Sequence, residues 1–435
     1  MKYYSTNHNV SEASLKEVII KGLASDKGLY MPEKFIPLPD DFYNEIEKYS
    51  FQEIACQVAT TLFGEDIPEE ELHQLVCDTL NFDVPVAKVN DNKYALELFH
   101  GPTLAFKDFG ARFMARMLHH FLKAESDGKM VNVLVATSGD TGGAVANGFL
   151  GVEGIHVYVL YPKGKVSPLQ EMQFTSLGQN ITALEVDGTF DDCQTLVKSA
   201  FLDEFLNTQM KLTSANSINV ARLLPQSFYY FYGYAQMKGL GLADNLVVCV
   251  PSGNFGNICA GLIAKRLGLP IKRFIAANNR NDVFYEYLKT GIYNPRISLQ
   301  TIANAMDVGA PSNFARILDL YHNDINAIRA DIGGARYNDH QIVEAISRIY
   351  EDYGYILDPH GACAYMGLED NLRQNETGLF LETAHPSKFI QTVEGIINKP
   401  VDLPERLQTF LKGRKQSIPF VNDFDSFKQY LLKHT

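Results

Sequence analysis

The stretch VNVLVATSGDTGG, residues 131–143, gives the clearest indication of the fold. Its first part, VNVLVAT, is a short run of mostly β-branched and aliphatic residues, which is typical of a buried strand. The hydroxyl residues and glycines that follow suit a tight turn, and a helical pattern begins near Gly143. A buried strand that passes through a turn into a helix is the repeating unit of parallel α/β sheets.

The same pattern recurs in two blocks of the chain, residues 131–215 and 245–400. We expect further strands at 155–162, 181–186, 245–251, 273–279 and 378–384, and helices at 168–177, from about 190 onward, and at 219–238. The sequence therefore predicts an α/β fold with two open, mostly parallel sheets, flanked by helices, around a central cleft.

The two ends of the chain differ from these blocks. Helical periodicity at residues 11–24, 42–63 and 68–80 predicts an N-terminal helical segment, and a helix at 424–432 ends a C-terminal appendage. At 435 residues the chain exceeds a usual single core. We expect an N-terminal helical segment at 1–92, a smaller α/β domain at 93–225, and a larger α/β domain with the appendage at 226–435.

Composition argues against several function classes. A net charge of −12 is unsuited to binding nucleic acid, which calls for a basic surface. No stretch approaches the about 20 apolar residues of a membrane span, and the N-terminus has no signal-like apolar core, so we expect a cytoplasmic protein. The six cysteines lack metal-ligand spacing and several lie in apolar runs, so we expect reduced packing residues and no metal.

Ligands of open parallel sheets bind beyond the carboxyl ends of the strands, so the loops there are the places to look for a site. Thr137–Gly143 offers hydroxyls and backbone N–H groups at a helix start, which suits an anion site or a capped turn equally well. Ser252–Asn257 (SGNFGN) follows the strand at 245–251, and its glycines allow close backbone approach to a phosphate. It is neither a P-loop nor a dinucleotide fingerprint.

Lys107 stands out among the lysines because it lies in an apolar setting, LAFKDF. Burial depresses the pKa of a lysine, which is what a Schiff-base lysine needs. A reactive lysine together with a glycine-rich phosphate loop is the equipment of a pyridoxal phosphate enzyme. Such a site needs a third group at the pyridine nitrogen. The candidate is Thr383, although a threonine there also suits a helix N-cap.

Six motifs in chain order resemble the threonine synthase family: HGPTLAFKDFGARF, ATSGDTGGAV, VPSGNFGN, NSINVARLLPQ, MDVGAPSNF and ETAHPSKF. With GLASDKGLYMPE near the start, the resemblance runs from about residue 3 to residue 400. It implies the fold of tryptophan synthase β-type (fold type II) pyridoxal phosphate enzymes. It also implies the conversion of O-phospho-L-homoserine and water to L-threonine and phosphate, the last step of threonine biosynthesis.

The resemblance implies a role for each residue whose motif matches. Lys107 would carry the cofactor as a Schiff base and shuttle protons, and Thr383 would bond the pyridine nitrogen. The cofactor phosphate would be held by Gly253, Asn254, Phe255, Gly256 and Asn257, and the substrate carboxylate by Thr137, Ser138, Gly139, Asp140 and Thr141. Asp140 stands where relatives often have an asparagine near the cofactor hydroxyl, so that contact is in doubt because two anionic oxygens would repel.

The substrate phosphate needs a second anion site, which we expect to be separate from the cofactor cradle. The candidates are Ser312, Asn313 and Arg316, with Lys163 from the facing sheet, and then Lys165, Arg112 and Arg222. Two other functions stay open: another enzyme of the same fold, such as a serine/threonine dehydratase or an O-acetylserine sulfhydrylase, or a non-catalytic phosphate-binding α/β protein. We expect a monomer or a small homo-oligomer.

Overall fold

The structure, a computed structural model, describes residues 1–123 and 129–434. The chain divides into two compact units, and each is described by itself. The first unit contains Met1–Met31, Lys107–Arg222 and Leu403–Thr435, and the second contains Pro32–Phe106 and Leu223–Asp402. The expected domain 93–225 includes residues 124–128, and the expected domain 226–435 includes Thr435; these lie outside the described residues.

The compact units follow different boundaries from the expected domains. The N-terminal strands and the C-terminal appendage belong to the unit that contains Lys107. Compact packing is a different criterion from independent folding, so the domain ranges 1–92, 93–225 and 226–435 stay a prediction.

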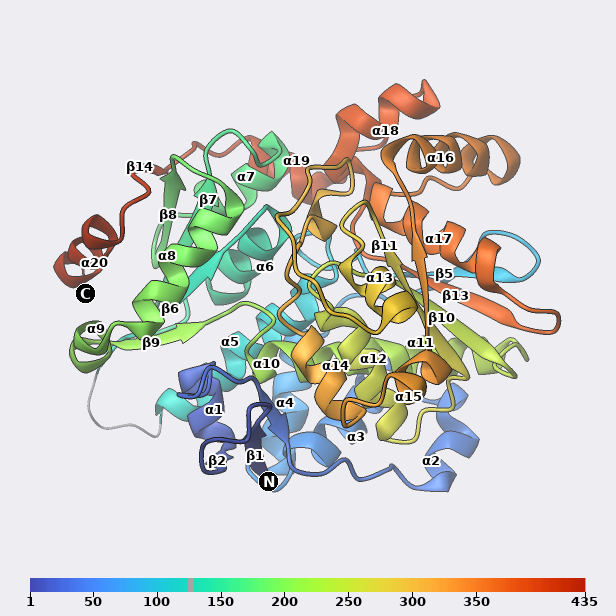
Figure 1. Cartoon of the computed structure of the whole chain (residues 1–435), viewed down its shortest axis with the longest axis horizontal. Helices are drawn as coiled ribbons and strands as arrows, with labels where there is room; N and C mark the ends of the chain where they lie inside the picture. The colour runs from blue at the N-terminus through green and yellow to red at the C-terminus, as the bar shows by residue number, and fades with distance from the viewer. Residues whose placement is uncertain (124–128, 435) are drawn as a thin grey trace. The chain divides into compact units, whose positions relative to one another are not determined.

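A five-stranded parallel sheet forms the centre of the first unit, in the order β14-β8-β7-β6-β9. Its strands are β6 (Val131–Ala136), β7 (Ile155–Pro162), β8 (Ile181–Val186), β9 (Lys211–Ser214) and β14 (Ile418–Phe420). Helices α8 (Phe190–Leu202), α9 (Glu204–Gln209) and α20 (Phe424–Lys433) share one apolar core with this sheet, and α8 crosses its face in Figure 1. The remaining helices are α1 (Leu15–Lys21), α5 (Lys107–Lys123), α6 (Asp140–Phe149), α7 (Pro168–Thr175), α10 (Val220–Leu223) and α19 (Glu405–Leu411).

A six-stranded sheet forms the centre of the second unit, in the order β12-β11-β10-β13-β5-β4. Its strands are β4 (Val86–Lys88), β5 (Lys93–Glu97), β10 (Leu246–Pro251), β11 (Arg273–Asn278), β12 (Ile332–Arg336) and β13 (Thr377–Glu382). All neighbours are parallel except the edge strand β4. All six residues of β10 are buried, which explains the apolar run LVVCVP without alternation.

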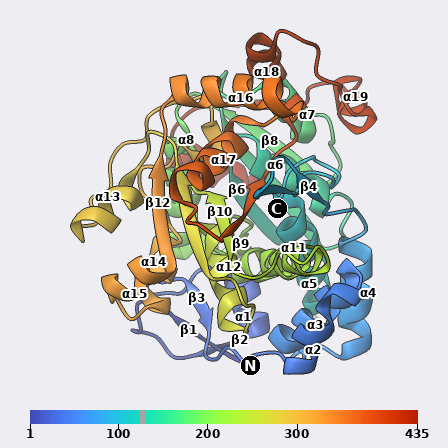
Figure 2. The ribbon, with the colours of Figure 1, turned by 90° about the vertical axis from the view of Figure 1, so that its right-hand side faces the viewer.

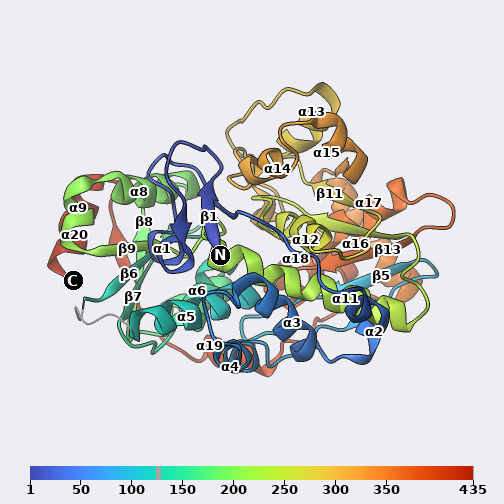
Figure 3. The same ribbon diagram turned by 90° about the horizontal axis from the view of Figure 1, so that it is seen from below.

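Helices cover both faces of this second sheet. On one face lie α16 (Asp339–Tyr353), α17 (Pro359–Asn371) and α18 (Ile390–Ile397), which share a large apolar core with the strands. On the other lie α11 (Ser227–Gly239) and α12 (Gly256–Arg266); Gly261 of α12 meets Phe274 of β11. The N-terminal helices α3 (Phe51–Phe63) and α4 (Glu69–Thr79) form a pair, and α3 packs against α11 (Figures 2 and 3). Shorter helices of this unit are α2 (Asp40–Glu45), α13 (Val283–Thr290), α14 (Phe314–Leu320) and α15 (Ile325–Asp331).

The predicted fold class is confirmed, and so are the strands expected at 131–137, 155–162, 181–186, 245–251, 273–279 and 378–384. The N-terminal region is less helical than expected, because β1 (Lys2–Ser5), β2 (Ala13–Ser14) and β3 (Tyr30–Pro32) form a small sheet and leave α1 only seven residues. The helix expected at 219–238 is broken into α10, a 3-10 turn at Leu224–Gln226 and α11, since Pro225 cannot donate a helical hydrogen bond. No helix of the described residues has both the length and the apolar character needed to cross a membrane.

Candidate active site

The loop SGNFGN joins β10 to α12 at the carboxyl edge of the second unit's sheet. Phe255 has a left-handed backbone (φ 63°), which turns the chain sharply into α12, and no side chain caps this helix. The first N–H groups of a helix have no partner within the helix. An uncapped helix start with its positive dipole end is a binding place for a phosphate.

Asn257 adds a side-chain donor to this loop. The hydroxyls of Tyr229 and Tyr230 donate to its Oδ1 at 2.7 and 2.6 Å, and Tyr230 also donates to its carbonyl oxygen at 2.9 Å. With Oδ1 held in this way, the amide Nδ2 is buried and has no hydrogen-bond partner among the described residues. Buried polar atoms of native proteins are rarely unpaired, so Nδ2 points to an acceptor supplied by a ligand.

The loop that contains Ser312, Asn313 and Arg316 is hydrogen-bonded to the loop SGNFGN. Asn254 accepts from the Ser312 backbone N–H at 2.6 Å through Oδ1, and from Asn313 Nδ2 at 3.0 Å through its carbonyl oxygen. The guanidinium of Arg316 donates to Asn313 Oδ1 at 2.6 Å and is fully buried. Hydrogen bonds therefore join the two loops, and the expected separate site for the substrate phosphate stays a prediction.

Gly253 lies close to the backbone of Ala305 and Met306. A Cβ atom there would lie 2.7 Å from Met306 Cα and 2.9 Å from the carbonyl oxygen of Ala305. Because backbone atoms cannot move aside easily, glycine is the residue that fits at this position.

Thr383 follows β13, the neighbour of β10 in the sheet, so both loops lie at the same carboxyl edge. Its side chain is 7% exposed, and its carbonyl oxygen accepts from the Phe106 N–H at 2.9 Å. The N-cap of the following 3-10 turn is His385, not Thr383. The alternative of a capping threonine is therefore wrong, and the Thr383 hydroxyl is left for another partner.

Lys107 is the first residue of α5 in the first unit, and it follows Phe106 directly in the chain. Its side chain is partly buried, and Asp108 beside it is 1% exposed. Arg222, an expected candidate for the substrate phosphate, is 2% exposed and donates through Nη1 to the carbonyl oxygen of Ala215. Arg222 thus packs inside the unit, and this burial lowers its pKa to about 10, although the charge of Asp108 raises it.

In the loop after β6, one side chain binds backbone N–H groups at the start of α6. Thr137 Oγ1 accepts from the N–H groups of Gly139 at 2.9 Å and Gly142 at 2.8 Å, so this hydroxyl organises the start of α6. Asp140 is buried and accepts from Gln170 Nε2 at 2.9 Å. Ser138 and Thr141 are only partly buried and are the side chains of this loop that a ligand can reach.

Lys163 and Lys165 lie after β7, the neighbour of β6, and both are exposed. Within the first unit, the structure thus places Lys163 and the loop Thr137–Thr141 at the carboxyl ends of adjacent strands. Within the second unit it brings together Gly253–Asn257, Ser312, Asn313 and Arg316.

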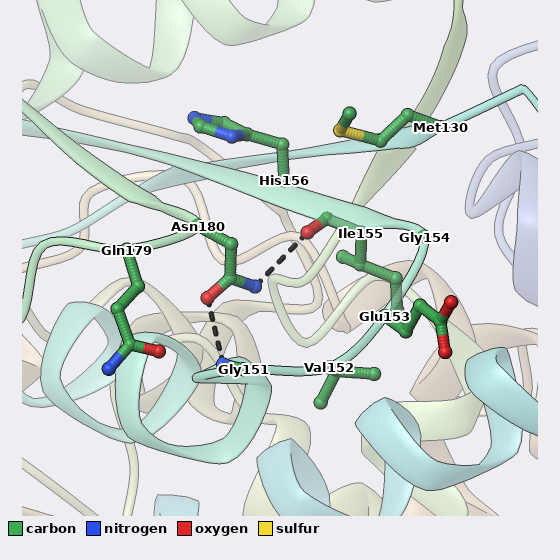
Figure 4. Close-up of a pocket in the computed structure, with 9 residues that line it drawn as sticks. All are labelled: Met130, Gly151, Val152, Glu153, Gly154, Ile155, His156, Gln179 and Asn180. Atoms are coloured by element: carbon green, nitrogen blue, oxygen red, sulfur yellow. Dashed lines mark hydrogen bonds between the residues drawn. The ribbon is translucent and has the colours of Figure 1, made fainter.

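A surface hollow of about 350 Å³ lies elsewhere in the first unit (Figure 4). It is lined by the residues around Gly151–His156, and Asn180 spans it with hydrogen bonds to Gly151 N and Ile155 O. These residues lie just before or at the start of β7 and β8, at the amino ends of the strands. Ligands of parallel sheets bind at the opposite edge, so this hollow is not part of the candidate site.

Two family profiles match this chain. The family profile described as pyridoxal-phosphate dependent enzyme matches residues 86–380, and the one described as threonine synthase N terminus matches residues 2–80. The threonine synthase of Haemophilus influenzae is 45% identical over 433 residues, which cover 100% of both chains. The chain belongs to the threonine synthase family.

Solved structures of the threonine synthase family have the same fold. The threonine synthase of Escherichia coli is similar with a TM-score of 0.94, 42% identity and 100% of both chains covered. The PLP-bound threonine synthase of Brucella melitensis has a TM-score of 0.92 and 33% identity, with 100% of this chain and 99% of that chain covered. The chain is accordingly a pyridoxal-phosphate-dependent lyase with the fold type II architecture.

The sequence analysis did not identify the residues that are hydrogen-bonded to the loop residue Asn257. Tyr229 and Tyr230 lie in an aromatic run, SFYYFYGY, that looks like ordinary core packing. Only the tertiary contact with Asn257 shows their role. Asp358 and His360 lie in the segment DPHGA, whose helix-capping pattern is a visible signal for structure but not for a site.

Proposed function

We propose that this chain converts O-phospho-L-homoserine and water to L-threonine and phosphate, with pyridoxal phosphate bound in the second unit. One observation carries the cofactor assignment: the buried Asn257 Nδ2, held by two tyrosine hydroxyls beside an uncapped helix start, lacks only an acceptor such as a phosphate oxygen. The substrate assignment is supported by the full-length similarity to threonine synthases.

The residues present fit the cofactor. Gly253, Asn254, Phe255, Gly256 and Asn257 would hold its phosphate, and the Thr383 hydroxyl would bond the pyridine nitrogen. When bound, pyridoxal phosphate withdraws electrons from the substrate and makes its carbon-bound protons acidic. The Lys107 amine would remove and return those protons, because a lysine displaced from the cofactor stays beside the substrate.

Substrate-binding roles are proposed for residues of three loops. Thr137, Ser138, Gly139, Asp140 and Thr141 would meet the carboxylate of the substrate, chiefly through the reachable hydroxyls of Ser138 and Thr141. Lys163 and the Ser312 loop would meet its phosphate. Since Arg316 is fully buried on Asn313, it would act by holding this loop in place.

Two further assignments complete the proposal. A cytoplasmic location is supported by six free cysteines, four of them buried. A monomer or a small homo-oligomer is the proposed assembly.

The test is direct turnover with a matched lysine control. Purified protein with pyridoxal phosphate should release phosphate from O-phospho-L-homoserine and form threonine, without dehydrating serine at a comparable rate. Lys107→Ala should lose turnover by several orders of magnitude and stay folded, whereas Lys123→Ala, at the exposed far end of the same helix, should be normal. Borohydride reduction should label Lys107; a label on Lys93 or Lys123 would overturn the assignment.

A further inference from the structure

Three ionisable side chains form a buried group behind Thr383, and none has a role in the function proposed above. Glu382 is the last residue of β13 and precedes Thr383 directly, while Asp358 caps α17 and His360 lies in its first turn. Their exposed fractions are 0%, 0% and 2%. Charged groups at such depth are costly unless they are paired or neutral, so their protonation states can be worked out from their partners.

His360 is neutral, with its proton on Nδ1. Its Nε2 accepts from the backbone N–H of Ala305 at 3.1 Å, and a backbone N–H can only donate. Nε2 is therefore unprotonated. The proton on Nδ1 is donated to Asp358 Oδ1 at 2.5 Å.

Asp358 is the acceptor of the group. Besides the ring of His360, it accepts from the backbone N–H groups of His360 at 2.8 Å and Gly361 at 3.3 Å. These donors stabilise its negative charge. Burial works against that charge, but the interaction with the His360 ring and the hydrogen bonds that Asp358 accepts hold the pKa of Asp358 below its usual value.

Glu382 has the opposite environment. Neither of its carboxyl oxygens has a hydrogen-bond donor among the described residues. A Cβ atom at Gly361 would lie 2.3 Å from its carboxyl carbon and from both oxygens, so the carboxyl packs directly against the start of α17, where Asp358 lies. Two neighbouring buried carboxyls without a donor between them require one proton, and Glu382, which lacks other donors, is the group that carries it.

We propose that Glu382, Asp358 and His360 form a hydrogen-bonded relay, with one proton between the two carboxyls, that positions both ends of the cofactor site. The inference rests on the proposed function, because it takes Thr383 and the Gly253 loop as that site. The three are positioning residues, since they act through other groups. Burial and the charge of Asp358 raise the pKa of Glu382 well above its usual value, in agreement with a neutral acid.

The relay reaches the site at two points. At one end Glu382 is bonded covalently to Thr383, and its carbonyl oxygen accepts from the Leu98 N–H at 2.9 Å. At the other end His360 holds the N–H of Ala305, and the Ala305–Met306 backbone packs against Gly253 of the phosphate loop. A substitution in the relay should therefore displace both Thr383, at the pyridine nitrogen, and the loop with Gly253, at the cofactor phosphate.

Other titratable groups face the relay, and they are the same in every variant below. Glu97 is paired with Glu382 in the sheet register and accepts from Tyr355 at 3.0 Å. Tyr355, Asp307, Cys363 and His385 also interact electrostatically with members of the group, and His100 and Lys388 act on His385. Burial lowers the pKa of His385 to about 4, so it is neutral at neutral pH.

The test of the shared proton uses protein without cofactor. Glu382→Gln keeps the shape and a donor to Asp358 but cannot titrate. A carboxyl with a raised folded pKa stabilises the fold below its unfolded value of about 4.5 and loses that contribution as pH rises. The Tm of wild type should thus fall relative to that of Glu382→Gln between pH 4.5 and 8. The infrared carbonyl band of a protonated carboxylic acid should be present in wild type and reduced in this variant.

Positioning is tested by the binding of pyridoxal phosphate. Glu382→Gln should bind it within about 2-fold of wild type, whereas Glu382→Ala, which leaves Asp358 without this donor, should bind on the order of 10-fold more weakly. Glu351→Gln, an exposed carboxyl of α16, is the matched control and should change neither the Tm difference nor the affinity.

A Tm difference that does not vary with pH, an unchanged carbonyl band, or equal affinity of the Gln and Ala variants would overturn the relay. If wild type binds no pyridoxal phosphate, the proposed function fails instead, while the infrared and Tm measurements on the free protein still decide the shared proton.

Discussion

At the scale of single residues, Thr383 is a side chain for which the structure excludes one of two expected roles, that of a helix cap. It does not cap the turn that follows, and its backbone is fixed by Phe106. We expect Thr383→Val to weaken the binding of pyridoxal phosphate by roughly 2- to 13-fold, which corresponds to the about 0.5–1.5 kcal/mol of a neutral hydrogen bond. Absorbance titration of the cofactor measures this, and Thr383→Ser should stay close to wild type. Normal affinity of the valine variant would show that the hydroxyl is not a ligand.

Tyr230 gives a second prediction at this scale, because it orients Asn257 without touching the expected ligand position itself. Burial raises the pKa of Tyr230 well above its usual value, so its hydroxyl stays a donor across the working pH range. Tyr230→Phe should leave Asn257 Oδ1 bonded to Tyr229 alone and weaken cofactor binding by roughly 2- to 13-fold. Tyr234→Phe, on the same helix but not bonded to Asn257, is the control. Equal affinity of both variants would contradict an orienting role.

At the scale of elements, the sheet of the second unit is fastened by a buried ion pair. Arg273 opens β11 and donates to Glu376, the residue before β13, at 2.6 and 3.3 Å. Burial alone would raise the pKa of Glu376, but bonds from Arg273, the Arg373 N–H and Lys272 lower it from 4.5 to about 2. The Glu376 side chain is 0% exposed, so removing its charge should destabilise the unit strongly.

Glu376→Gln should lower the free energy of unfolding by about 3–5 kcal/mol at neutral pH, because it leaves a buried guanidinium without its carboxylate. A carboxyl with a lowered folded pKa stabilises above its unfolded value and loses this effect as pH falls. The gap between wild type and variant should therefore be constant above pH 5 and shrink between pH 4.5 and about 2. Denaturant unfolding across this range checks it, with Glu344→Gln, 65% exposed, as the control. A gap that stays constant down to pH 2 would contradict the ion pair.

At the scale of the whole molecule, the C-terminal appendage is an integral part of the first unit. Strand β14 extends the sheet next to β8, and Phe427 and Leu431 of α20 are 0% exposed in its core. Phe427→Ala should destabilise this unit by about 3–5 kcal/mol, while Leu432→Ala, 37% exposed, should cost little. Calorimetry of both variants measures the difference. Equal transition temperatures would mean that the appendage is not part of the folding unit.

The sequence by itself was enough to predict the strands, the α/β class and the family. Buried parallel strands are continuous apolar runs, and VNVLVAT, IHVYVLYP and NLVVCVP show that pattern without any knowledge of their partners. The carboxyl-end rule then selected the loops Thr137–Gly143 and Ser252–Asn257. Lys107 was selected by its apolar neighbours and by the motif around it.

Only the tertiary structure decided what supports these loops and which elements complete each sheet. The three-residue strand β14 is too short to carry a pattern, and it is defined by its pairing with β8. Several contacts join residues far apart in the chain. They are the tyrosine hydroxyls that donate to Asn257, the bonds that Asn254 accepts from the Ser312 loop, and the group of Glu382, Asp358 and His360. Such contacts depend on distances in space and on the exclusion of water, and neither is encoded in the local spacing of residues along a chain.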